Sequence, residues 1–175
     1  HEVFSILWPR LSACDGVLAG TLAMDSCRIE KGYRHFGHDI GGDDHVLEAG
    51  LGFAVRTTKK DGRFGPFLGR DAALRKKEAG LTKRMLQFRL KDPAPLLYRN
   101  EPIVRDGRVV GYLTSGAYGH CIGAAVGMGY VSSSMGEGDA DLLASSYEIE
   151  IAGVRWTALA SVAPMYDPRS ARMRA

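Results

Sequence analysis

Apolar residues in the first part of the chain recur at the spacing of an α-helix. The opening segment places five of them on one helical face: Val3, Phe4, Leu7, Trp8 and Leu11. Pro9 would bend or interrupt that helix. Two further helices are predicted over residues 22–31 and 70–79, because each is followed by a glycine that can end it, Gly32 or Gly80.

From about residue 81 the pattern changes to the alternation that is typical of strands. The dipeptide Asp106-Gly107 is a strong hairpin signal, and Ala152-Gly153 is predicted to turn between the last two strands. Strand patterns cover residues 85–90, the two arms of the 104–113 hairpin, 124–131, 147–151 and 154–162. We therefore predict an α+β fold. Helices occupy the start. The strands that follow are typical of a small antiparallel barrel or sandwich, and we predict a barrel without helices over residues 81–162.

Composition narrows the class of protein without giving a function. With 175 residues and 45% hydrophobic content, the chain can hold one domain, or one domain and the remnant of another. No run approaches the ~18 consecutive apolar residues of a membrane span. A net charge of +3 is too small to argue for nucleic acid. The cysteines Cys14, Cys27 and Cys121 suit reduced, mostly buried thiols in the cytoplasm, or in the mitochondrial matrix of a eukaryote.

The most informative stretch is residues 28–33, RIEKGY, at the end of the second predicted helix. A carboxylate held at a helix end can accept two parallel hydrogen bonds from a planar N–H/NH2 edge, such as that of a pterin ring. Taken alone, an Arg-x-Glu pair is an ordinary solvated helix end, in which Glu30 pairs with Arg28 or Arg34. Residues elsewhere in the chain favour the first interpretation.

This stretch resembles the arginine-x-glutamate signature of the folate-dependent aminomethyltransferase family. That family includes the glycine cleavage T-protein and the rear half of dimethylglycine and sarcosine dehydrogenases. Further blocks are similar to the family in the same order: residues 45–55, 65–78 and 107–131, the last with Thr114-Ser115-Gly116 at its centre. The end of the chain, residues 164–174, is similar to the close of the flavin dehydrogenase branch.

The resemblance implies two domains. Residues 1–80 would be the C-terminal remnant of the folate-binding domain with a linker helix, and residues 81–175 the C-terminal β-barrel domain. It also implies tetrahydrofolate as a cofactor, bound through Arg28, Glu30, Tyr33, Phe53 and Lys59. The resemblance implies no catalytic residue and no metal site in this chain.

Three of these residues have distinct implied roles. Glu30 would accept the pterin edge, and Arg28 would hold Glu30 ionised, since a nearby cation favours the charged form. Lys59 stands where the T-protein places a basic residue, counted from Phe53, although arginine is common there. It would attract the glutamyl carboxylates of folate. A solvated basic loop is an equal alternative for Lys59.

Two other groups of residues carry weaker signals. His35, His38 and Asp39 could in principle ligate zinc or iron, but the glycine-rich segment 37–44 is predicted to be a loop and lacks the spacing of a known site. His120 and Cys121 are neighbours in a hairpin and would point to opposite faces. We therefore interpret them as structural rather than as a nucleophile pair.

Some expected parts have no counterpart. The aspartate that family members place beside the reacting folate nitrogen is missing, and no G-x-G-x-x-G fingerprint follows a strand pattern. We therefore expect a C-terminal fragment of a longer protein, with FAD bound only in a missing upstream region. This chain alone is expected to show neither dehydrogenase activity nor bound flavin.

The function that the resemblance implies is capture of a one-carbon unit on tetrahydrofolate, after a flavin domain oxidises an N-methyl amine of the dimethylglycine or sarcosine type. The partners would be folate and that amine through the full-length protein, with no nucleic acid and no membrane, and with homo-oligomerisation left open. Two alternatives stay open. One is a flavin-independent, folate-dependent aminomethyltransferase or demethylase, and the other is a barrel that mediates docking without catalysis.

Overall fold

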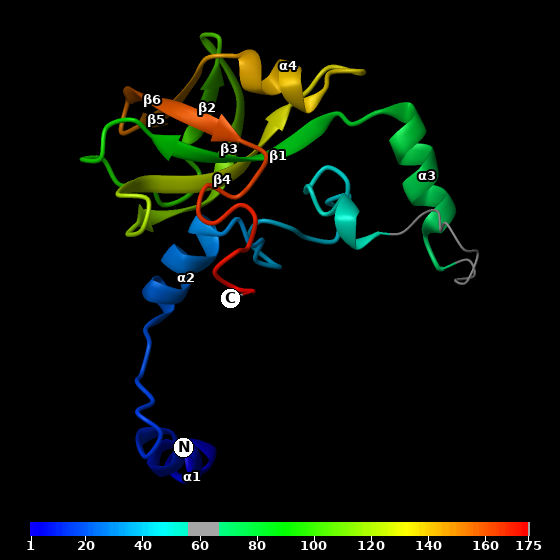
Figure 1. Ribbon diagram of the computed structural model, residues 1–175. Coiled ribbons are helices and arrows are strands. Elements are labelled where there is room, and N and C mark those ends of the chain that lie inside the picture. Colours follow the sequence, from blue (N-terminus) through cyan, green and yellow to red (C-terminus); the bar gives the residue numbers. More distant parts are fainter. Residues whose placement is uncertain (56–66, 175) are drawn as a thin grey trace.

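The computed structural model describes residues 1–55 and 67–174. Within these residues lies a closed barrel of six strands, in which every neighbouring pair is antiparallel (Figure 1). The order around the barrel is β1-β4-β3-β2-β5-β6. The strands are β1 Lys83–Leu90, β2 Pro102–Arg105, β3 Arg108–Gly119, β4 Ala124–Ser132, β5 Tyr147–Ile151 and β6 Val154–Ser161. The fold is α+β, as the change of period near residue 81 predicted.

Both predicted hairpin turns are present. Asp106 and Gly107 join β2 to β3 with φ of 49° and 82°, and Ala152 and Gly153 join β5 to β6 with φ of 49° and 80°. Two consecutive residues with positive φ are typical of a type I′ turn, whose twist matches the twist of the flanking strands. Glycine takes the second position at no steric cost.

Alternation along the strands separates the barrel interior from its outer face. The interior core contains twelve buried residues, with Phe88 packed edge-on against Tyr147 at a centroid separation of 5.4 Å. A second, smaller cluster lies on the outer face. Its buried members are Ile29, Met85, Val126 and Met128. Because Ile29 belongs to helix α2 (Thr21–Glu30), this part of the sheet is buried on both sides.

The helices before the barrel begin and end close to their predicted positions. α2 starts and ends one residue before the predicted bounds, and α3 covers Arg70–Ala79 as predicted. The opening helix, α1, covers Glu2–Ser12 with Pro9 inside it, and a short 3-10 helix covers Gly52–Ala54. No helix in residues 1–55 or 67–174 is long and apolar enough to cross a membrane.

The prediction that no helix interrupts the barrel was wrong. Helix α4, Asp139–Ala144, lies in the connection between β4 and β5. It has six residues and buries only Leu142, so it carries almost no apolar periodicity. Its start is marked by acidic residues instead: Asp139 and Asp141 lie in the first turn, and Asp141 accepts a hydrogen bond from the Gly138 N–H at 2.9 Å.

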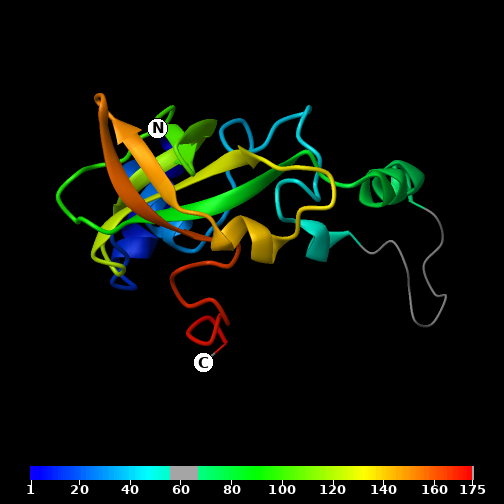
Figure 2. The ribbon, with the colours of Figure 1, turned by 90° about the horizontal axis from the view of Figure 1, so that it is seen from above.

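The helices differ in how closely they contact the barrel. α2 packs against β3 and β4, whereas α1 stands apart at the end of an extended segment and has no buried residue (Figure 1). Seen from above, α3 lies beyond the end of β1 (Figure 2). The division into domains after residue 80 stays a prediction.

Candidate functional site

The predicted folate-binding residues begin at the C-terminal end of α2, where a Schellman motif stops the helix. The Gly32 N–H donates to the Ile29 carbonyl at 2.9 Å, and the Tyr33 N–H donates to the Arg28 carbonyl at 2.8 Å. Gly32 takes φ of 67°, which glycine adopts without strain. The chain therefore turns sharply and directs residues 33–44 back toward the barrel.

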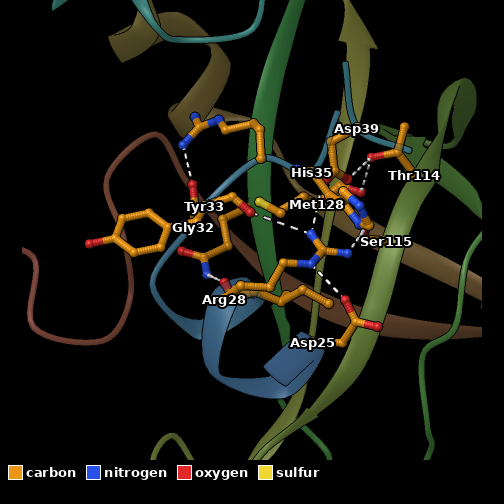
Figure 3. Close-up of polar contacts among 12 residues, drawn as sticks. Asp25, Arg28, Gly32, Tyr33, His35, Asp39, Thr114, Ser115 and Met128 are labelled. Atoms are coloured by element: carbon orange, nitrogen blue, oxygen red, sulfur yellow. Dashed lines mark hydrogen bonds and ion pairs between the residues drawn. The ribbon is translucent and has the colours of Figure 1, made fainter. Parts of the chain in front are cut away.

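Arg28 is the centre of a polar network at this helix end (Figure 3). Its guanidinium donates to Asp25 Oδ1 at 2.7 Å, to Asp39 Oδ2 at 2.7 Å and to Ser115 Oγ at 2.9 Å. The Asp39 side chain is fully buried and the Arg28 side chain is 13% exposed. A buried ion pair of this kind is stable only with further hydrogen bonds to its remaining polar atoms.

Asp39 has those further bonds. Its carboxylate also accepts from the Thr114 hydroxyl at 2.6 Å and from the His35 N–H at 2.8 Å. Thr114 reaches it because β3 bulges here, so that Leu113 and Ser115 pair with consecutive residues of β4 and Thr114 is the extra residue. A bulge re-aims the side chain of the extra residue. The network thereby joins α2, the following loop and β3.

The expected pairing of Arg28 with Glu30 was wrong. Side chains two positions apart on a helix point in very different directions, so they do not face each other. Arg28 points to Asp39, while the Glu30 carboxylate points to the turn between β3 and β4. There Oε1 accepts the N–H groups of Cys121 at 2.7 Å and Ile122 at 3.0 Å.

The backbone around Glu30 is held equally firmly. Gln87 of β1 donates its amide N–H to the carbonyls of Ile29 and Glu30, and Tyr166 donates its N–H to the Glu30 carbonyl at 3.2 Å. Glu30 is only 3% exposed. A Cβ at Gly119 would stand 3.0 Å from Glu30 Oε1, so the glycine leaves room for the carboxylate.

Two other predicted binding residues, Tyr33 and Phe53, share one cavity. This cavity of about 490 Å³ lies beside the end of α2 and is closed on one side by the C-terminal segment. Its lining consists of Lys31, Gly32, Tyr33, Arg34, Gly50, Leu51, Phe53, Val162 and Pro164. Both aromatic rings are accessible, with Tyr33 50% and Phe53 83% exposed. Lys59, the fifth predicted residue, lies outside the described residues.

The two positively charged side chains that line this cavity, Lys31 and Arg34, already bind other groups of the protein. Lys31 donates to the carbonyl and the carboxylate of Asp167, with both side chains 9% exposed. Arg34 donates to the carbonyls of Ala49 and Gly32. Burial, and then the nearby Arg84, lower the pKa of Arg34. These contacts fix the cavity wall and leave little free positive charge.

The weaker metal hypothesis gains no support from this geometry. His35 and His38 stack on each other at 4.4 Å, and Asp39 is bound to Arg28 and Thr114. Within residues 1–55 and 67–174 no group of three histidine, cysteine or acidic residues is arranged to hold a metal ion.

Sequence reasoning missed the roles of Asp39 and Gln87 at this junction. Asp39 was considered only as a metal ligand, and Gln87 was one position in a strand. Thr114 and Ser115 were identified only as the centre of a similar block. The signal available for Asp39 was its position in the loop that directly follows the arginine-x-glutamate run.

Two models of known protein families together match most of the chain. Residues 1–59 match the model of the GCVT N-terminal domain, and residues 83–167 match the model of the glycine cleavage T-protein C-terminal barrel domain. Among solved structures, the glycine cleavage system aminomethyltransferase T from Bartonella henselae has a TM-score of 0.72 at 23% identity. That similarity covers 88% of this chain and 41% of the Bartonella chain, and it supports the fold alone.

Curated relatives are much longer than this chain. The 4-methylaminobutanoate oxidase (formaldehyde-forming) of Paenarthrobacter nicotinovorans is 39% identical over 99% of this chain and 20% of its own length. The mitochondrial sarcosine dehydrogenase of Homo sapiens is 37% identical over 89% of this chain and 17% of its own length. The chain thus spans about a fifth of either relative. From the two family models, the fold and these relatives, we conclude that the chain belongs to the glycine cleavage T-protein family.

Proposed function

We propose that this chain forms the folate-binding, one-carbon-transfer end of a flavin-dependent N-methyl amine dehydrogenase. The family match and the names of the relatives support this class of protein. The observation that carries the proposal is that Tyr33 and Phe53, expected from the sequence to contact folate, line one cavity next to the buried end of α2. The chain alone would not be catalytic. FAD would belong to an upstream region.

The aromatic residues of the cavity suit a planar ring, whereas Glu30 offers fewer hydrogen bonds to such a ring than the sequence suggested. The two aromatic side chains offer flat apolar surfaces for a ring. Among the described residues, the hydrogen bonds to the Glu30 carboxylate all end on Oε1, which already accepts two N–H groups. We therefore revise the expected pair of parallel bonds: only Oε2 would be available to a pterin N–H or amino group. That contact would be a single charge-assisted bond.

Each part of the chain would then have a defined task. Tetrahydrofolate, when bound, supplies the acceptor for the one-carbon unit. Glu30 is not one of the residues that line this cavity, so its Oε2 would have to meet the edge of a ring that extends past the end of α2. The barrel would hold Glu30 through the β3–β4 turn, and the segment containing Pro164 would shield the cavity from water. Positioning of reactants in a shielded site is the main contribution that such a scaffold makes.

A second candidate function is suggested by one relative. The Paenarthrobacter oxidase is named as formaldehyde-forming. A protein with this chain could likewise release the one-carbon unit as formaldehyde rather than transfer it. A flavin-independent aminomethyltransferase or demethylase and a non-catalytic docking barrel are the further alternatives.

The substitution Glu30→Gln tests the proposal in the full-length enzyme. A bond to a charged acceptor contributes about 1.5–3 kcal/mol. The amide retains one acceptor and adds a donor, so tetrahydrofolate affinity should fall at least about tenfold, or roughly 1.4 kcal/mol. Isothermal titration calorimetry measures the affinity, and formaldehyde release with and without tetrahydrofolate measures capture.

A matched control separates the carboxylate from general damage. Glu150→Gln removes a charge that pairs with Arg155 on the barrel surface and should leave folate affinity unchanged. Equal affinities for wild type and Glu30→Gln would remove Glu30 from the folate site. If the wild-type enzyme binds no tetrahydrofolate and releases all its one-carbon product as formaldehyde, the second candidate function replaces the first.

A further inference from the structure

Two exposed cysteines lie next to the Glu30 carboxylate. Cys27 precedes Glu30 by three residues on α2, so the two side chains are neighbours on one helix face. Cys121 lies in the turn between β3 and β4 and donates its backbone N–H to Glu30 Oε1. Both thiols are exposed, as is that of Cys14. The expectation of mostly buried thiols was therefore wrong.

Further contacts keep these two segments side by side. Ser26, the neighbour of Cys27, donates its hydroxyl to the Tyr118 carbonyl at 2.7 Å. Ile122, the neighbour of Cys121, donates its N–H to Glu30. The charge of Glu30 is the main cause that raises the pKa of Cys121, and the charge of Cys27 adds to it. Hydrogen bonds next to both cysteines therefore hold the end of α2 against the turn between β3 and β4.

We propose that Cys27 and Cys121 form a reversible disulfide that fastens the last turn of α2 to the turn between β3 and β4. A disulfide requires Cα atoms within about 7 Å of each other. The side chains of Cys27 and Cys121 are both exposed, so rotating them toward each other would disturb no core packing. The proposal is independent of folate binding.

The oxidant in this proposal is a peroxide. One thiolate attacks a peroxide oxygen, the O–O bond breaks, and a sulfenic acid and one water or alcohol form. The second thiol then attacks the sulfenic sulfur, the S–S bond forms and a water leaves. Two thiols thus lose two electrons and two protons, and the peroxide accepts them. The Glu30 carboxylate, which accepts the Cys121 N–H, raises the pKa of the Cys121 thiol and so disfavours its thiolate; we therefore assign the first attack to Cys27 and the second to Cys121.

Thiol counting and peptide mapping test the pair directly. The 175-residue chain is treated with stoichiometric hydrogen peroxide, denatured, and titrated for free thiols, and its non-reduced peptides are mapped by mass spectrometry. We expect the thiol count to fall from three to one, a peptide that links Cys27 to Cys121, and recovery of all three thiols with dithiothreitol. Cys14→Ser should form the same link.

Two single variants test the assigned order. In Cys121→Ser, dimedone should trap a sulfenic acid on Cys27 within the time in which wild type forms the disulfide. In Cys27→Ser, trapping on Cys121 should be at least several-fold slower. Retention of three thiols in wild type, a link that includes Cys14, or disulfides only between chains would overturn the proposal. Equal trapping rates would overturn the assigned order. Peptide mapping of wild type needs no variant to fold.

Discussion

Helices α1 and α2 have similar apolar patterns in the sequence, but they differ sharply in how much of each helix is buried. Both carry apolar residues at helical spacing, and both are helical in the structure. α1 has no buried residue, and Val3, Phe4, Leu7 and Leu11 are all about half exposed or more. α2 buries Ser26, Ile29 and Glu30 against the barrel. The period of a pattern thus predicts a helix, but not what the helix packs against.

The decisive difference is the presence of polar partners as well as apolar ones. α2 fits the outer face of the barrel because Arg28 and Glu30 find buried partners on either side of Ile29. Unpaired, each of these charges would cost several kcal/mol on burial. Fixed contacts of this kind select one position of the helix on the barrel, whereas an apolar stripe alone would tolerate several.

The largest expected effect comes from truncating matched apolar residues in the two helices. Ile29 is 1% exposed and packs with Met85, Val126 and Met128, so Ile29→Ala should lower the free energy of unfolding by about 2–5 kcal/mol. Leu7 is 48% exposed, and Leu7→Ala should change the free energy of unfolding by less than about 0.5 kcal/mol. Urea denaturation followed by circular dichroism measures both. Similar losses in the two variants would show that α1 packs onto the protein in solution.

The second largest effect is expected from breaking the buried ion pair between Arg28 and Asp39. Asp39→Asn leaves the Arg28 guanidinium without its charged partner and places an amide where Thr114 and His35 donate. We expect a loss of about 3 kcal/mol at pH 7, at the lower end for a broken buried pair. Asp15→Asn, in the exposed segment after α1, is the control and should be close to neutral. A loss below about 1 kcal/mol for Asp39→Asn would mean that the network contributes little.

A steric test of the close approach between β3 and the backbone of residues 97–98 uses glycines. A Cβ at Gly116 would lie 2.5 Å from the Tyr98 carbonyl oxygen and 2.6 Å from the Leu97 carbonyl carbon, both backbone atoms that cannot move alone. Gly116→Ala should therefore lower the free energy of unfolding by about 1–3 kcal/mol. Gly42, an exposed loop residue without a positive φ, has no atom within 4 Å of such a Cβ, so Gly42→Ala should keep the free energy of unfolding within about 0.5 kcal/mol of wild type. Thermal melts would rank the two variants, and equal midpoints would contradict the close approach.

The smallest effect concerns the C-terminal segment in acid. Burial alone would raise the pKa of Asp167, but hydrogen bonds from Lys31 and the Ala171 N–H outweigh it, and the pKa is lowered from 3.8. The folded state therefore binds this proton less readily. Its stabilisation is present above about pH 4 and is lost as the pH falls through the lowered pKa.

The variant Asp167→Asn removes this acid dependence. Between pH 5 and pH 2, its melting temperature should fall less steeply than that of wild type. Asp43→Asn, at an exposed position of the loop, should follow the wild-type curve. Parallel curves for wild type and Asp167→Asn would show that the Lys31 contact does not persist in solution.

Local signals in the sequence placed most of the elements. Glycine after α2 and α3 ended those helices, and the Asp106-Gly107 and Ala152-Gly153 dipeptides set two hairpins whose geometry needs only neighbouring residues. α4 was missed because a six-residue helix with one buried side chain offers too little periodicity. Turns and helix ends depend on neighbouring residues, so a local pattern predicts them. A six-residue helix has too few residues to form such a pattern, so it was missed.

The sequence by itself determined the α+β fold, the order of elements and the family resemblance, because period, turn residues and motif order are properties of the chain. Only the tertiary structure decided that Arg28 pairs with Asp39 rather than Glu30, that a bulge turns Thr114 toward Asp39, and that the Glu30 carboxylate binds the Cys121 N–H. These contacts join residues far apart in the chain. Their partners depend on how strand register and helix placement bring distant segments together, which no local pattern records.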